Sequence, residues 1–196
     1  VRVFRISFSG ELSYEIAAPA GQTRALWDRL MEAGAEFGVM PYGTEALHIM
    51  RAEKGFIMIG DETDGTVIPQ DLGLSWAVSK KKEDFLGKRG MERPAMTSSE
   101  RWQLVGLETL DGSVLPDGAL APLDGVNANG QRQTQGRVTS TYFSPTLGKG
   151  IALGLVHRGP DRMGEVISFM GEDGKPVSAR IVDAVFFDKA GEKQNV

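Results

Sequence analysis

The segment Phe8-Ser9-Gly10-Glu11-Leu12-Ser13-Tyr14-Glu15-Ile16 decides the fold of the amino-terminal part of the chain. An extended run over residues 1–8, a Ser-Gly turn and an alternating stretch after it predict a β-hairpin. On the second strand, Glu15 shares a face with the small residues Ser13 and Ala17. A carboxylate held in this way has room to accept two N–H groups from a flat heterocycle. The alternative from spacing alone is a strand glutamate that faces water.

Further motifs follow this segment in order along nearly the whole chain. They are Pro41-Tyr42-Gly43-Thr44-Glu45-Ala46-Leu47, Arg51-Ala52-Glu53-Lys54-Gly55-Phe56, Gly60-Asp61-Glu62-Thr63-Asp64-Gly65-Thr66, Gly73-Leu74-Ser75-Trp76-Ala77-Val78, Gly136-Arg137-Val138-Thr139-Ser140, Ser144-Pro145-Thr146-Leu147 and Ile151-Ala152-Leu153-Gly154. With them the chain resembles the folate-dependent aminomethyltransferase (T-protein) family. It is more similar still to the carboxy-terminal part of the alpha subunits of heterotetrameric sarcosine oxidases.

The resemblance implies that the chain binds the cofactor tetrahydrofolate. Glu15 falls on the glutamate that holds the pterin ring in this family, and Phe8 falls on an aromatic position that is usually tyrosine. A phenylalanine can still stack on the pterin but cannot donate a hydroxyl hydrogen bond. Phe56 falls where the family carries a ring near the folate, and its alternative role is that of a core aromatic residue.

Two departures from the family favour the sarcosine oxidase branch. Leu47 stands where T-proteins carry an arginine, and a second arginine of the barrel domain is replaced near Leu115. The resemblance then implies an enzyme part that helps to capture the one-carbon unit of sarcosine as 5,10-methylenetetrahydrofolate. No catalytic residue is expected in this segment, because the family aspartate would precede Val1. Flavin and NAD sites are expected on other parts of the full enzyme.

Other readings of the resemblance stay open. The chain could belong to a glycine-cleavage-type aminomethyltransferase or another folate-dependent demethylase, or it could be a non-catalytic scaffold that keeps the folate fold. Arg51 is interpreted as a structural ion-pair residue. The run Lys80-Lys81-Lys82 could meet a polyglutamylated folate tail, although a solvated loop is the simpler interpretation.

Composition excludes several other classes of function. The 196 residues are 41% apolar and 24% charged, with 22 basic and 26 acidic side chains. The net charge of −4 argues against a nucleic-acid partner, and no apolar run is long enough for a membrane span. The absence of cysteine excludes disulfides and thiolate sites, and only two histidines, His48 and His157, make a metal site improbable. A cytoplasmic protein is expected.

The pattern along the chain predicts an α+β protein of two parts. Residues 1–95 would form the end of an aminomethyltransferase-type folate-binding domain, with helices over residues 26–37 and 45–54, short strands over 56–59 and 73–78, and Trp76 as a core anchor. Residues 96–196 would form a small all-β barrel, with strands over 102–107, 119–122, 136–142, 151–156, 166–170 and 177–185. Since the chain begins at Val1 inside a strand, the missing strand partners are expected upstream in a longer polypeptide, and the tail from Lys189 is expected to fray.

Overall fold

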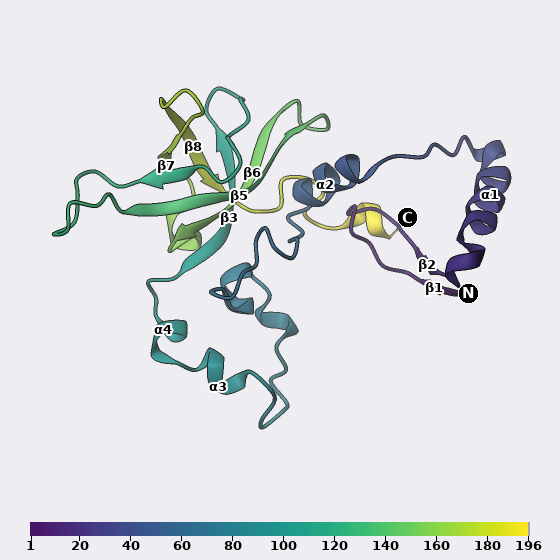
Figure 1. The fold of residues 1–196 in the computed structure, drawn as a ribbon, viewed down its shortest axis with the longest axis horizontal. Coiled ribbons are helices and arrows are strands. Elements are labelled where there is room, and N and C mark those ends of the chain that lie inside the picture. The colour runs from purple at the N-terminus through teal and green to yellow at the C-terminus, as the bar shows by residue number, and fades with distance from the viewer. Residues whose placement is uncertain (196) are drawn as a thin grey trace.

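A computed structural model describes residues 1–195, and it places two unlike halves at opposite ends of an elongated molecule (Figure 1). Strands β1 (Arg2–Phe4) and β2 (Glu15–Ala17) pair antiparallel, with Phe4 opposite Glu15. Helix α1 (Thr23–Gly34) follows beside this hairpin, and helix α2 (Thr44–Glu53) leads from it to the second half. Both helices were predicted from the sequence. Gly38, after the 3-10 turn that follows α1, and Gly55, just after α2, take φ of +69° and +70°, a conformation that glycine adopts without steric cost.

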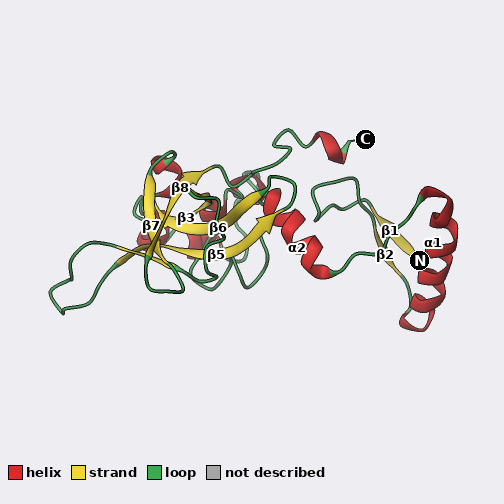
Figure 2. Cartoon of the chain, turned by 90° about the horizontal axis from the view of Figure 1, so that it is seen from above, coloured by secondary structure: helices red, strands yellow, loops and turns green. Residues whose placement is uncertain are grey.

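The second half is a six-stranded antiparallel sheet that curls into a nearly closed barrel. Its strands are β3 (Trp102–Thr109), β4 (Leu120–Pro122), β5 (Thr134–Ser144), β6 (Lys149–His157), β7 (Val166–Met170) and β8 (Pro176–Val182), in the spatial order β4-β5-β6-β3-β8-β7. The two outer strands, β4 and β7, contact each other and bring the ends of the sheet together. Figure 2 shows the curled sheet at the end of the molecule opposite β1 and β2. The predicted fold class, α+β with a carboxy-terminal β-barrel, is confirmed.

One side of each barrel strand supplies the hydrophobic core. The buried core residues are Val105, Leu107, Leu115, Ala119, Ala121, Val138, Ala152, Val156, Ile167, Phe169, Ala179 and Ile181. They alternate with less buried positions along β7 and β8, the pattern expected of strands with one face turned inward.

Along the chain between α2 and β3, residues 54–101 form a long segment of loops and short helical turns. It contains 3-10 turns at Pro69–Leu72 and Ser75–Ala77 and the one-turn helices α3 (Lys88–Met91) and α4 (Pro94–Thr97). The predicted strands at residues 56–59 and 73–78 are wrong, because these short apolar runs have no neighbouring strand to pair with among the residues described. Trp76 is 80% exposed, so its predicted role as a core anchor is wrong for the part of the chain described.

The amino-terminal hairpin also differs from the sequence prediction. Only three residue pairs join β1 and β2, and residues 5–14 form an open loop in place of a tight Ser-Gly turn. In α1 and the 3-10 turn that follows it, Leu30 and Phe37 remain 47% and 82% exposed. Gly43 takes the N-cap position of α2. No helix formed by residues 1–195 has the length and apolar character of a membrane span.

Candidate functional site

The carboxyl end of α2 lies between the hairpin loop and the barrel, and it buries three charged side chains. Arg51, Glu53 and Lys54 are at most 7% exposed. Burying a charge is costly unless the charge is paired and hydrogen-bonded. Each of the three has such partners, and each reaches a different part of the chain.

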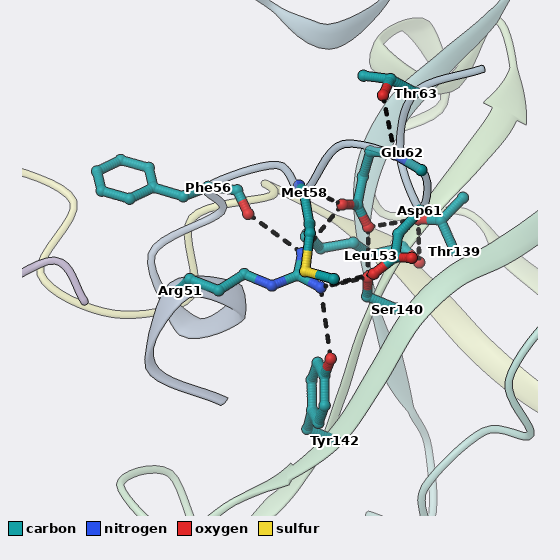
Figure 3. Close-up of polar contacts among 11 residues, drawn as sticks. Arg51, Phe56, Met58, Asp61, Glu62, Thr63, Thr139, Ser140, Tyr142 and Leu153 are labelled. Carbon is teal, nitrogen blue, oxygen red and sulfur yellow. Dashed lines mark hydrogen bonds and ion pairs between the residues drawn. The ribbon is translucent and has the colours of Figure 1, made fainter. Parts of the chain in front are cut away.

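Arg51 is at the centre of a buried polar network (Figure 3). Its Nη1 donates to Glu62 Oε2 at 3.0 Å and to the carbonyl oxygen of Phe56 at 3.2 Å. Its Nη2 lies 2.7 Å from Ser140 Oγ and 3.3 Å from Asp61 Oδ2. Arg51 and Glu62 are both fully buried, so this ion pair is shielded from water and salt. The interpretation of Arg51 as an ion-pair residue agrees with this geometry.

The other side of the network depends on a β-bulge in β5. Val138 pairs with Gly154 and Ser140 with Leu153, so Thr139 is an extra residue in the ladder. Neighbouring side chains of a regular strand point to opposite faces, but a bulge can turn two of them to one side. Thr139 Oγ1 and Ser140 Oγ therefore both reach Glu62 Oε1, at 2.9 and 2.5 Å. The bulge thus lets two hydroxyl groups donate to Glu62, the carboxylate of the buried ion pair.

Glu53 and Lys54 attach the end of α2 to two further segments. Glu53 accepts hydrogen bonds from the hydroxyl of Ser144, the last residue of β5, at 2.5 Å and from that of Thr146 at 3.1 Å. Lys54 Nζ donates to the Asp188 carboxylate at 2.9 Å and to the Asp188 carbonyl oxygen. The hydrogen bond from Lys54 lowers the pKa of Asp188 below its usual value.

The predicted folate residues lie on three different segments, two of which reach this helix end. Glu15 is exposed on β2, Phe8 is half-buried in the loop between β1 and β2, and Phe56 is half-buried two residues after Lys54. The loop reaches the helix end at Gly10, where an added Cβ would lie 2.9 Å from Lys54 Cγ. The structure therefore brings the Phe8 loop and the Phe56 segment to one junction, while Glu15 lies beyond the loop.

A cavity of about 110 Å³ lies at this junction. It is lined by Ser9, Gly10, Glu11, Met50, Glu53, Lys54, Thr146, Phe187 and Lys193, and not by the three predicted folate residues. Phe56 points its ring away from the Arg51 network, while its carbonyl oxygen accepts from Arg51 (Figure 3). An exposed carboxylate on a strand and a half-exposed ring in the adjoining loop fit the donors and the flat face of a pterin.

The remaining residues singled out from the sequence lie in α2, in the barrel core, in an exposed loop and on the barrel surface. Leu47 is half-buried in α2, and Leu115 belongs to the barrel core at 2% exposure. Lys80, Lys81 and Lys82 are exposed in a loop, as expected of a solvated run. His157 Nε2 lies 2.9 Å from Glu100 Oε2 on the surface of the barrel. Within residues 1–195 no group of three or more metal-ligating side chains comes together.

Sequence reasoning missed the carboxyl-terminal residues at this junction. Residues 192–194 form a 3-10 turn that binds the hairpin loop, although a frayed tail was predicted. The polar composition of the tail carries no signal for this docking, since its contacts are made with residues more than 130 positions away.

A surface ion pair near the start of β5 predicts an acid-dependent stability. Asp64 accepts from the hydroxyl and the backbone N–H of Thr66 and pairs with Arg137 at 2.9 Å, and these contacts lower its pKa from 3.8 to about 2. A carboxyl group with a lower pKa in the folded state stabilises the fold above its unfolded pKa, and this contribution is lost as the pH falls toward 2. We expect Asp64→Asn to lose less stability than the wild type between pH 5 and pH 2 in urea unfolding. Asp124→Asn, on an exposed loop, is the control, and equal losses in the wild type and Asp64→Asn would contradict the expectation.

Comparison with known proteins matches both parts of the chain to family models. Residues 1–82 match the model of the GCVT N-terminal domain, and residues 103–188 match the glycine cleavage T-protein C-terminal barrel domain. The two matches follow each other along the chain in the order of an amino-terminal and a carboxyl-terminal domain. A T-protein structure supports this at the level of the fold: glycine cleavage system aminomethyltransferase T from Bartonella henselae is 26% identical, with a TM-score of 0.77 over 95% of this chain and 50% of that one.

Two kinds of curated relative match the chain, and sarcosine oxidase alpha subunits are more similar to it than the aminomethyltransferases are. The alpha subunit from Corynebacterium sp. (strain U-96) is 45% identical over 196 residues, and that from Rhizobium meliloti (strain 1021) is 43% identical over 203 residues. Each match covers 99% of this chain and 20% of the relative. The aminomethyltransferase of Caldanaerobacter subterraneus subsp. tengcongensis is 32% identical, over 97% of the chain and 49% of the relative. The chain thus spans about a fifth of the length of the alpha subunits that it matches.

Proposed function

We propose that the chain is the tetrahydrofolate-binding part of a sarcosine oxidase alpha subunit, within a cytoplasmic oxidoreductase. The observation that carries this proposal is the identity of 43–45% to sarcosine oxidase alpha subunits along the whole chain, against 30–32% to aminomethyltransferases. The departure at Leu47 supports the same branch. In the complete enzyme this part would help to capture the one-carbon unit of sarcosine as 5,10-methylenetetrahydrofolate.

Three residues of the chain would hold the folate. The Glu15 carboxylate would accept the N–H groups of the pterin ring, because a charged acceptor forms stronger hydrogen bonds than a neutral one. Phe8 would stack on the face of the ring, and Phe56 would contribute a second apolar surface. Support for this assignment comes from the exposure of Glu15 and from the meeting of the Phe8 and Phe56 segments at the end of α2.

Positioning is the contribution that these residues would make to the reaction. When bound, tetrahydrofolate supplies the nitrogen nucleophiles that take up a one-carbon unit. Holding the folate in one orientation raises its effective concentration beside the reacting carbon. Flavin and NAD sites would lie on other parts of the enzyme.

The exposed apolar side chains support a larger assembly. Phe37, Met40, Trp76 and Leu86 are each at least 80% exposed, and burial of such large apolar side chains against another surface would be favourable. We assign these surfaces to contacts with the upstream part of the same polypeptide and with other sarcosine oxidase subunits. The division into parts at residues 95 and 96 is likewise a proposal, supported by family matches that end at residue 82 and resume at residue 103.

Titration of 5-formyltetrahydrofolate into the complete polypeptide tests the folate site. Glu15→Ala is expected to raise Kd about 10- to 100-fold, the loss expected for a hydrogen-bonded charge. Glu36→Ala, which removes another exposed glutamate, is the control and should bind as the wild type does. Equal affinity in the wild type and Glu15→Ala would refute the role of Glu15, and no binding by the wild type would favour a non-catalytic scaffold.

Aminomethyltransferase activity is the second candidate. The TM-score of 0.77 to the Bartonella henselae aminomethyltransferase favours it. Leu47 counts against it, since T-proteins carry an arginine at that position. Transfer of an aminomethyl group from a lipoyl carrier to tetrahydrofolate by the complete polypeptide would establish this function in place of the first.

A further inference from the structure

The carboxyl-terminal tail, residues 187–195, lies on the hairpin loop formed by residues 5–14. The N–H of Leu12 donates to the carbonyl oxygen of Lys193 at 3.0 Å, and Arg5 Nη2 donates to the carbonyl oxygen of Gln194 at 2.8 Å. Lys193 Nζ also lies 3.4 Å from Glu11 Oε1. Figure 1 shows the tail beside this loop.

Asp188 fixes the tail in this place. Its carboxylate accepts from Lys54 Nζ at 2.9 Å, from the N–H of Glu192 at 2.9 Å and from the N–H of Lys193 at 3.2 Å. Lys54 and Asp188 are only 8% and 9% exposed, which protects their ion pair from screening by salt. The Asp188 backbone is held at φ +47°, an uncommon conformation for a residue with a side chain.

The hairpin loop has little support of its own. Only three residue pairs join β1 and β2, and within the loop the N–H groups of Gly10 and Glu11 bond to nearby serine hydroxyls. Among the residues described, its long-range hydrogen bonds are all with the tail, and Gly10 packs on the methylene chain of Lys54. Few buried contacts and an open backbone are features of segments that unfold locally at low cost. The tail and Lys54 therefore determine where the loop lies.

We propose that the tail, fastened by the Asp188–Lys54 pair, positions the hairpin loop for folate binding. Asp188 and Lys54 would act through the loop and not by touching the ligand. The tail holds the segment that carries Phe8, so loss of the pair would leave the aromatic face free to move. This inference rests on the proposed function, because it assigns the loop to the folate site.

Hydrogen exchange and folate titration on the complete polypeptide test the inference together. Asp188→Asn keeps the shape of the side chain and removes its charge. We expect about tenfold faster amide exchange in residues 5–14 and about a five- to tenfold higher Kd for 5-formyltetrahydrofolate. Lys189→Ala is the matched control. Lys189 belongs to the same tail but pairs with the exposed Asp183, so this substitution should change neither measurement. Deletion of residues 190–196 is the second variant and should have a larger effect in the same direction.

Each outcome decides the inference. Unchanged exchange in residues 5–14 in both variants overturns it, since the tail would then not order the loop. Faster exchange with an unchanged Kd also overturns it, because the tail would then serve stability alone. If the wild type binds no folate, the proposed function fails and the positioning role fails with it, while exchange still shows whether the tail orders the loop.

Discussion

Replacing Arg51 with methionine is expected to destabilise the folded protein by about 3–5 kcal/mol, because the substitution leaves Glu62 charged, buried and without its cation. Glu62 is fully buried and would keep only the hydroxyls of Thr139 and Ser140 and the N–H of Met58. Chemical denaturation of the complete polypeptide measures this loss, followed by a probe that reports on the barrel.

Two further variants separate charge from packing. Arg24→Met removes an exposed pair with Asp28 on α1 and should change the stability by about 0–0.5 kcal/mol. Arg51→Met combined with Glu62→Gln removes both charges and should recover part of the loss, as removal of both partners of a buried pair often does. A loss below about 1 kcal/mol in Arg51→Met alone would show that the pair is not needed for the fold.

The substitution Gly106→Ala is expected to cost about 3 kcal/mol through overpacking. Gly106 lies in β3, between Leu153 of β6 and Val182 of β8. An added Cβ would lie 2.3 Å from the carbonyl oxygen of Asp183 and 2.8 Å from Phe186 Cζ, so the chain after β8 must move. That chain leads directly into the carboxyl-terminal tail.

Thermal unfolding measures the effect, with Gly65→Ala as the matched control. Gly65 has no heavy atom within 4 Å of an added Cβ, and its φ is not in the left-handed region. A surface change of this kind should stay within about 0.5 kcal/mol. Equal stabilities of the two variants would mean that the segment after β8 shifts without cost.

The regular elements could be predicted from the sequence because their patterns are local. The strand over residues 166–170 alternates buried and exposed positions, and its predicted bounds match β7. The helix over residues 45–54 is followed by a glycine that can end it, and its predicted bounds lie within one residue of α2. The alternation of a strand and the glycine that ends a helix can both be recognised within a short stretch of sequence, without knowledge of distant contacts.

The junction could not be predicted because its contacts are not local. Arg51 and Ser140 are 89 positions apart, and Lys54 and Asp188 are 134 apart. Arginine and lysine are residue types that usually lie at the surface, whereas the fold buries Arg51 and Lys54 at the end of α2. The prediction that Trp76 is a core anchor was wrong for a related reason. Its apolar character indicates burial, but its side chain is 80% exposed in the part of the chain described. The roles of Glu15, Phe8 and Phe56 stay predictions.

The bulge at Thr139 limits how this architecture can be recombined. Because one additional residue in β5 turns two hydroxyls toward Glu62, deleting a single codon there would restore simple alternation and remove one of them from the carboxylate. A chimera that joins this barrel to the first half of another protein would also leave the Thr139 and Ser140 hydroxyls without their carboxylate acceptor, unless the Asp61–Glu62 loop is transferred with the barrel. The bulged strand and the acidic loop form one structural unit, and shuffling experiments should place their crossover points outside it.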